Sequence, residues 1–330
     1  MIFQLLILFG SIILLSFAAH WLVQGISSLA HFLRWREFVV AFFVMAIGGS
    51  IPNLVVGISS ALHGIPELSL GDVVGNSVID LTLVVALAVL VGGNLTAQGK
   101  LIQQTALLTI FAAVAPLILL LDQTLSRMDG IILILLFFAY SAWMITHRTE
   151  HVQTYTHENG KYTALKTFGL TILGLIFLIL AAEGLVGSVS FFAETFGLPI
   201  AVVGILGISL VNSLPELYFA VTAAKRGKSR IVLGELMGSV IILTSLVLGV
   251  VAFLAPITID NFSPFALARF FLVIVAFFFL LFMRTGRSIS KKEAIFLVSL
   301  YLAFVVGEIF FQGPVEQCLE MLGKGCENLL

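Results

Sequence analysis

Long apolar stretches alternate with short polar breaks along almost the whole chain. A helix needs about 20 apolar residues to cross the hydrocarbon core of a bilayer. The pattern therefore predicts ten membrane-spanning helices, near residues 2–31, 37–63, 69–92, 101–121, 129–147, 164–196, 199–225, 231–254, 264–284 and 292–311. We expect an all-α integral membrane protein with the lipid bilayer as its solvent.

Composition supports this fold class. The chain has 330 residues, of which 60% are hydrophobic and 11% are charged, and its mean hydropathy is +1.14. Soluble domains carry about 25% charged residues, so this chain has too little polar surface for a water-soluble globule. The net charge of −1 says nothing about nucleic acid, and no basic tail indicates it as a partner, so we expect none. No obligate protein partner is evident.

The distribution of basic residues predicts the orientation. With the N-terminus outside and the spans alternating, cytoplasmic loops hold 14 of the 17 Lys and Arg residues. Arg127, Arg269 and Lys324 then remain outside. Because basic residues are enriched in cytoplasmic loops, we expect both termini to be extracytoplasmic, in a plasma or inner membrane.

The chain also repeats itself at an offset of 163 residues. Ser50, Pro52, Gly71 and Gly75 have identical counterparts at positions 213, 215, 234 and 238. Five predicted spans separate the copies, so the second copy should enter the membrane in the opposite direction. This predicts two inverted five-helix repeats at 1–147 and 164–311, a cytoplasmic linker at 148–163 and an extracytoplasmic tail at 312–330. Inverted repeats are an architecture of secondary transporters.

Each repeat contains a short polar stretch inside a span, at residues 48–53 and 211–216. Pro52 and Pro215 each remove one backbone donor, so we expect the helix to break or kink there. In hydrocarbon, freed backbone groups are tolerated only where protein or a water-filled cavity satisfies them. Broken helices with polar side chains indicate a transporter's binding site near the bilayer midplane.

Two carboxylates give this site its chemistry. Asp80 and Glu216 lie inside predicted spans, and no Lys or Arg lies inside any neighbouring span. Since a buried carboxylate is costly without a partner, a bound cation, a proton or both must neutralise them. Ligands that are all oxygen suit hard cations such as Ca²⁺ or Na⁺. The predicted site comprises Ser50, Asn53, Asn76, Asp80, Asn212, Ser213, Glu216 and Ser239.

Other polar residues allow two interpretations each. His20 and Glu183 pair at the repeat offset and either line an aqueous approach or make supporting hydrogen bonds. Cys318 and Cys326 either form a disulfide outside the membrane or are free thiols. Serine in a membrane helix often bonds its own backbone, and glycine often serves close helix packing.

The doubled pattern G-x-S-x-P-[NE] followed by L-G-[DE]-x-x-G-[NS] resembles the α-repeats of the cation/Ca²⁺ exchanger superfamily. The resemblance implies ten helices in two inverted halves, with ion sites between the second, third, seventh and eighth. It also implies exchange of Ca²⁺ for Na⁺ or H⁺, with one central Glu ligand from each repeat.

This chain departs from that pattern at several ligand positions. Glu216 matches one of the two central acids, whereas Asn53 stands at the other. The threonine expected before each motif serine is replaced by Gly49 and Asn212. In the following helices, Asn76 and Asp80 stand at one pair of ligand positions; the equivalent pair in the second repeat is Ser239 and Leu243. We therefore expect Asp80 and Glu216 to supply a charge of −2, with no further carboxylate in the site, and ion selectivity to be altered.

We expect a secondary active antiporter that exchanges Ca²⁺, or another divalent cation, for Na⁺ by alternating access, with no cofactor. Two alternatives stay open: an H⁺-coupled cation exchanger with altered selectivity, and a transport-inactive ion-binding sensor. An intramembrane hydrolase is disfavoured because H-E-x-x-H is absent and Gly71-Asp72 lacks the preceding glycine of a G-x-G-D motif. A passive channel would more naturally have a symmetric filter made by several subunits.

Overall fold

The computed structural model describes residues 1–32, 46–146, 164–196, 199–259 and 263–327. Apart from two short pairs of β-strands, the regular structure in this part of the chain is helical. The first half comprises α1 (Ile2–Phe32), α3 (Ile47–Leu62), α4 (Pro66–Ile79), η2 (Asp80–Val84), α5 (Val85–Gly92), β1 (Leu95–Thr96), α6 (Lys100–Leu119), η3 (Leu120–Asp122), β2 (Thr124–Leu125) and α7 (Arg127–Thr146).

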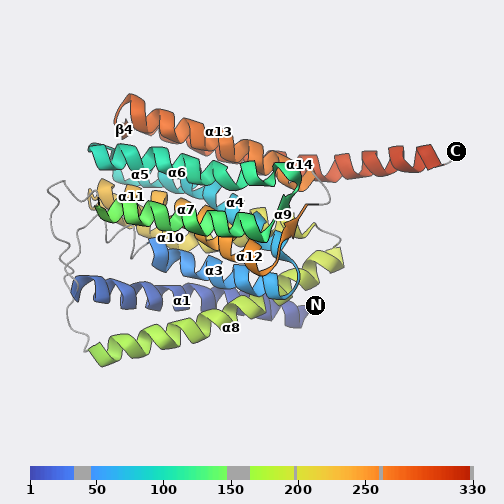
Figure 1. The fold of residues 1–330 in the computed structure, drawn as a ribbon, viewed down its shortest axis with the longest axis horizontal. Helices are drawn as coiled ribbons and strands as arrows, with labels where there is room; N and C mark the ends of the chain where they lie inside the picture. Colours follow the sequence, from blue (N-terminus) through green and yellow to red (C-terminus); the bar gives the residue numbers. More distant parts are fainter. Residues whose placement is uncertain (33–45, 147–163, 197–198, 260–262, 328–330) are drawn as a thin grey trace.

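The second half comprises α8 (Ala164–Phe196), α9 (Ile200–Val202), η4 (Val203–Ile208), α10 (Ser209–Lys225), α11 (Ser229–Ile241), η5 (Ile242–Val247), α12 (Leu248–Leu254), β3 (Ile257–Thr258), α13 (Ser263–Thr285), β4 (Ser288–Ile289) and α14 (Lys291–Glu327). The segments η2, η4 and η5 are π-helical turns within longer helices, and η3 is a 3₁₀ turn. The helices lie side by side, and the C-terminal part of α14 projects beyond the others (Figure 1).

Eight helices in the described residues are long and apolar enough to cross a membrane. They coincide with the third to tenth predicted spans. The helices α1 and α3 lie at the first two predicted spans, where Ile2–Leu15 and Ile47–Leu62 are shorter apolar helices. The all-helical membrane architecture is thus confirmed, whereas the count of ten spans stays a prediction.

Two spans form the centre of the protein. The most apolar windows of Pro66–Gly92 and Ser229–Leu254 are each 83% buried, whereas those of α13 and α14 are 33% and 22% buried. Outer helices expose large apolar side chains, including Phe111, Leu135 and Phe277. Apolar surface of this kind suits contact with lipid, so the polar residues of the central spans lie away from the bilayer.

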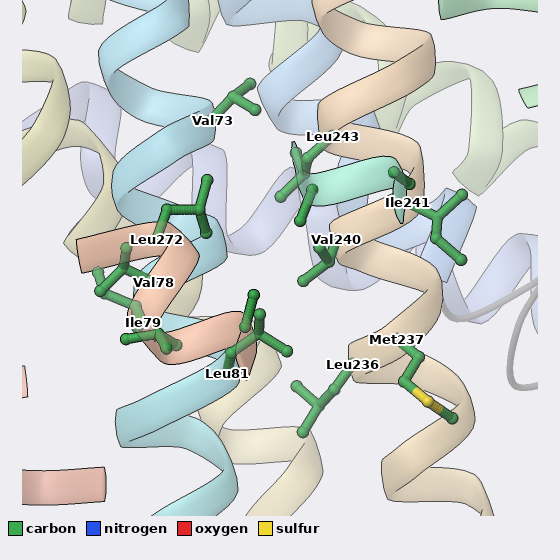
Figure 2. Packing of buried hydrophobic residues seen from close by; sticks show 14 of the residues in the cluster. Val73, Val78, Ile79, Leu81, Leu236, Met237, Val240, Ile241, Leu243 and Leu272 are labelled. Atoms are coloured by element: carbon green, nitrogen blue, oxygen red, sulfur yellow. The ribbon is translucent and has the colours of Figure 1, made fainter. Parts of the chain in front are cut away.

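The central spans of the two halves pack against each other and run in opposite directions. In Figure 2, the chain runs down the view from Val73 to Leu81, whereas it runs up the view from Leu236 to Leu243. These residues belong to one buried apolar cluster, which also includes Leu272 of α13. The core therefore places α4 and η2 directly beside α11 and η5.

Element boundaries recur at the predicted offset. Helix α4 with η2 and α5 covers 66–92, and α11 with η5 and α12 covers 229–254. The strands exchange between halves, because β1 pairs with β4 whereas β2 pairs with β3. In the two ladders, Leu95 pairs with Ile289 and Leu125 pairs with Ile257. The inverted relation of the two halves stays a prediction.

The prediction of helix breaks at the motif prolines is wrong, whereas kinks there stay a prediction. Pro52 lies inside α3 and Pro215 lies inside α10, and neither residue ends its helix. A proline is tolerated in a membrane helix where neighbouring groups and local π adjustments satisfy the freed backbone. Here the π-helical η4 directly precedes α10, so the irregular hydrogen bonding lies upstream of Pro215.

Several predictions fall outside the described structure. The linker 148–163 lies outside the described residues, and the side chains of His20, Cys318 and Cys326 are not described either. The backbone of the predicted tail continues α14 as a helix to Glu327. The alternatives for these three side chains stay open.

Candidate cation site

The structure buries all eight predicted site residues, each with at most 4% of its surface exposed. They come from α3, α4, η2, α10 and α11, so both halves contribute. Ser50 and Asn53 lie on α3, Asn76 on α4, Asp80 on η2, Asn212, Ser213 and Glu216 on α10, and Ser239 on α11.

Hydrogen bonds join these helices in pairs. The Ser213 hydroxyl lies 2.9 Å from Asn76 Oδ1 and 2.8 Å from the backbone oxygen of Ser209, two acceptors for one hydroxyl proton. The Ser239 hydroxyl donates to Glu216 Oε1 at 2.9 Å. The first contact links α10 to α4 across the two halves, and the second links α10 to α11.

Several buried oxygens have no hydrogen-bond partner in the structure. They include both carboxylate oxygens of Asp80, Glu216 Oε2, Ser50 Oγ and Asn53 Oδ1. Unpaired buried acceptors are unfavourable, by about 1–3 kcal/mol each and more for charged groups. This set of oxygens is therefore suited to accept a cation.

The groups that act electrostatically on Asp80 are themselves acidic. Asp80 interacts with Glu235, Glu216 and Asp72, and it lies close to the Ser239 hydroxyl. In the described part of the chain, no Lys, Arg or His side chain is recorded against Asp80 or Glu216. The sequence-based expectation of carboxylates without a basic partner is met in this part of the chain.

Two further buried acids are not among the site residues predicted from the sequence. Asp72 on α4 is fully buried, and Glu235 on α11 is 2% exposed. Asp72 Oδ2 accepts hydrogen bonds from Asn53 Nδ2 at 3.2 Å and from Asn212 Nδ2 at 3.1 Å. The expectation of no further carboxylate is thus wrong, because these acids lie at the [DE] position of the repeated L-G-[DE] pattern. That recurrence was the signal that could have identified them.

Acids alone do not make the site. In the described ranges, no three of His, Cys, Asp and Glu are grouped closely enough to hold a metal ion. A cation held here would therefore also need hydroxyl and amide oxygens, as hard cations accept. Leu243, at a position where the resemblance implies an Asn or Asp, is fully buried and apolar.

Glu183 makes a contact that the sequence analysis did not predict. Its carboxylate lies 3.6 Å from the imidazole Nε2 of His63, which follows the end of α3. Both side chains are about half exposed, 46% for Glu183 and 48% for His63. The contact joins α8 to α3, away from the eight buried site residues.

Comparisons with known proteins agree with this geometry. The family model described as sodium/calcium exchanger protein matches residues 3–146 and 166–310. An uncharacterized membrane protein of Methanocaldococcus jannaschii is 28% identical, covering 69% of this chain and 74% of that protein. The sodium/calcium exchanger MaX1 of Methanosarcina acetivorans is 26% identical, covering 92% of this chain and 97% of that protein.

The fold is similar to a solved structure of the sodium-calcium exchanger NCX_Mj, soaked with Na⁺ and Sr²⁺. The TM-score is 0.66 at 25% identity, and the match covers 92% of this chain and 98% of that one. The family model spans nearly the whole chain, including both copies of the polar motif. The chain is therefore a membrane transporter that belongs to the sodium/calcium exchanger protein family.

Proposed function

We propose that this protein exchanges Ca²⁺, or another divalent cation, for Na⁺ through the buried site between α3, α4, α10 and α11. The observation that carries the proposal is the pair Asp80 and Glu216, in which both oxygens of Asp80 and Oε2 of Glu216 lack hydrogen-bond partners and whose recorded charged neighbours are acids. A mobile cation can neutralise such carboxylates while it occupies the site and leave them again on release.

The binding oxygens are of the kinds that hard cations use. Carboxylate, amide and hydroxyl oxygens converge from both halves, and such ligands suit Ca²⁺ and Na⁺ better than soft metals. Membership of the family and the named relatives support cation antiport. The specific pair of ions remains our proposal, because Asn53 stands where the resemblance implies a Glu and Leu243 stands where it implies an Asn or Asp.

We further propose that the two halves are inverted repeats that open the site alternately to each side. The exchange of strand partners, β1 with β4 and β2 with β3, supports a two-fold relation between the halves. The opposite directions of α4 and α11 support an axis within the membrane plane (Figure 2). We keep the predicted orientation with both termini extracytoplasmic, based on the distribution of Lys and Arg.

Proton coupling is the second candidate. Asp72, Asp80, Glu216 and Glu235 carry as much as −4 together when all are ionised. One Ca²⁺ compensates half of that charge, so protons are a plausible second cargo. This candidate predicts uptake driven by a pH gradient in the absence of Na⁺.

Transport in proteoliposomes tests both candidates. Vesicles loaded with Na⁺ and diluted into Na⁺-free buffer should accumulate radiolabelled Ca²⁺, and Asp80→Asn and Glu216→Gln should abolish this uptake. Glu183→Gln, which removes a half-exposed acid outside the site, is the matched control. Uptake driven by a pH gradient alone would favour proton coupling. The absence of uptake under either gradient would refute antiport and favour an ion-binding sensor.

A further inference from the structure

Asp72 lies where three helices meet, and its carboxylate accepts hydrogen bonds from amide groups of both halves. Asn53 of α3 donates to Oδ2 at 3.2 Å. Asn212 of α10 donates through the same amide nitrogen to Oδ1 at 3.2 Å and to Oδ2 at 3.1 Å. All three side chains are buried, with exposures of 0% for Asp72 and Asn53 and 4% for Asn212.

The chemistry of these groups fixes which way each amide points. An ionised carboxylate accepts hydrogen bonds and cannot donate them, so an asparagine meets it through its NH₂ group. The amide oxygen is then directed elsewhere. In the structure, Asn53 Oδ1 and Asn212 Oδ1 are both buried and without hydrogen-bond partners.

An amide oxygen left in this condition is suited to a cation. Leaving a buried acceptor unpaired is unfavourable, and Asn carbonyl oxygens are common ligands of hard cations. The carboxylate of Asp72 is itself already occupied by the amide contacts. The Asp72 carboxylate therefore contacts the NH₂ groups of Asn53 and Asn212, and the two amide oxygens are left for another partner.

We propose that Asp72 is a positioning residue that turns the oxygens of Asn53 and Asn212 toward the transported cation. The inference rests on the proposed function and adds a residue and a role to its site. An asparagine at position 72 has one acceptor oxygen and its own NH₂ group. An amide oxygen can accept two hydrogen bonds but carries no full charge, so it holds the two neighbouring NH₂ groups more weakly than the carboxylate does, and the new NH₂ group disfavours any amide NH₂ that faces it.

The equivalent position in the other half lacks this arrangement. Glu235 corresponds to Asp72 at the repeat offset, but the counterparts of Asn53 and Asn212 are Glu216 and Gly49. Glu235 interacts with Glu216, and its Oε2 lacks a hydrogen-bond partner. Glu235→Gln is therefore a matched control, because it removes one buried charge near the site where no amide is oriented.

The test is a mutant cycle on the purified full chain. Apparent Kd values for Ca²⁺ and Na⁺ are measured by equilibrium binding and by cation-dependent thermal stabilisation. Removing a group that orients a ligand typically weakens metal binding about 10- to 100-fold, and we expect Asp72→Asn to fall in this range. In an Asn53→Ala/Asn212→Ala background, the added effect of Asp72→Asn should shrink to that of Glu235→Gln, because coupled residues are not additive.

The possible outcomes distinguish a positioning role of Asp72 from other roles. Equal weakening by Asp72→Asn in both backgrounds would overturn the inference, because Asp72 would then act without the amides. A lower ion-free Tm with unchanged Kd would show a structural role alone and would also overturn it. If the triple variant does not purify, Asn53→Ala replaces the double background, where the effect of Asp72→Asn must still be smaller than in wild type. A wild-type protein that binds no tested cation would refute the proposed function, whereas intact wild-type binding with an unaffected Asp72→Asn would refute this inference alone.

Discussion

The close approach of α4 to η4 offers a sharp test of how the site is held together. Gly75 immediately precedes Asn76 and faces the π-helical turn before α10. A Cβ atom at position 75 would lie 2.2 Å from the backbone oxygen of Ile205 and 2.6 Å from the Ser209 hydroxyl. Ordinary contacts begin near 3.4 Å, so Gly75→Ala requires the two backbones to separate by about 1.2 Å, since protein interiors are close-packed.

This separation should weaken both stability and binding. Overpacking in a well-packed interior typically destabilises a protein by about 1–3 kcal/mol, and here the obstacle is backbone that cannot rotate away. The Ser213 hydroxyl lies 2.9 Å from Asn76 Oδ1, and moving α10 with η4 would stretch this to about 4 Å, beyond a hydrogen bond. We therefore expect Gly75→Ala to lower the ion-free Tm and to weaken cation binding.

A matched variant isolates the clash from the general effect of replacing glycine. At Gly207, in the same π-helical turn, an added Cβ would meet Val203 Cγ1 at 3.6 Å, which is an ordinary contact. Alanine favours a helix over glycine by about 1 kcal/mol, and both variants share this gain. Thermal unfolding with and without Ca²⁺ should therefore leave Gly207→Ala near wild type. Equal Tm and equal cation stabilisation for Gly75→Ala would show that α4 and η4 do not approach as closely as the structure indicates.

Three further predictions concern the polar residues of the site. Asp80→Asn and Glu216→Gln should each abolish Na⁺-driven Ca²⁺ uptake. Each should change the ion-free unfolding free energy by less than about 1 kcal/mol, since neutralising an unpaired buried charge removes its desolvation penalty. Transport that persists in either variant would exclude that residue from the site. Ser239→Ala should weaken Ca²⁺ binding because it removes the donor to Glu216 Oε1, a bond to a charged group worth about 1.5–3 kcal/mol. The control Ser77→Ala should bind Ca²⁺ normally, because the Ser77 hydroxyl bonds to the backbone of its own helix at Val73. Equal Kd values for the two variants would contradict this prediction. Asn53→Glu should tighten Ca²⁺ binding at about pH 9, and this gain in affinity should disappear on acidification. The new carboxylate would face Asp72, so protons compete with the cation at lower pH. An unchanged Ca²⁺ affinity at the alkaline pH would show that position 53 does not face the ion.

The positions of the spans could be predicted because the bilayer imposes a simple length rule. Every backbone group in hydrocarbon must be paired within the protein, so long apolar stretches become helices. The boundaries of Pro66–Gly92 and Ser229–Leu254 differ from the predicted 69–92 and 231–254 by three residues or fewer. The offset of 163 residues also predicted which elements would correspond, because equal local sequences form equal local structures.

The local form of the helices could not be predicted in the same way. Pro52 and Pro215 suggested breaks at their own positions, but whether a helix continues through a proline depends on what neighbouring elements provide. The π-helical turns η2, η4 and η5 bear no relation to a proline at their own positions. The turn η4 lies instead where α4 crosses it at Gly71 and Gly204, a long-range contact that one sequence does not specify.

The role of Asp72 was hidden for a related reason. Its motif neighbours are glycines, whose usual function is helix packing, so the acid was grouped with them. Its partner Asn212 lies 140 residues away in the chain. A contact between halves at such a distance follows from tertiary packing and not from local pattern.

The unequal polar content of the two halves explains why counting motif residues underestimated the charge of the site. Asn53 replaces an acid of the family pattern, and that substitution alone suggests a loss of negative charge. In the structure, however, Asn53 donates to the buried acid Asp72, whereas its counterpart Glu216 interacts with the acids Asp80 and Glu235. A glutamate at position 53 would place a second acid against Asp72 in a low-dielectric interior, where like charges repel strongly. An amide at that position instead donates to the Asp72 carboxylate, and the further acids lie near Glu216. A cation that moves through this site should therefore be held mainly by the carboxylates near α10 and α11, and the amide oxygens from α3 and α10 complete its coordination.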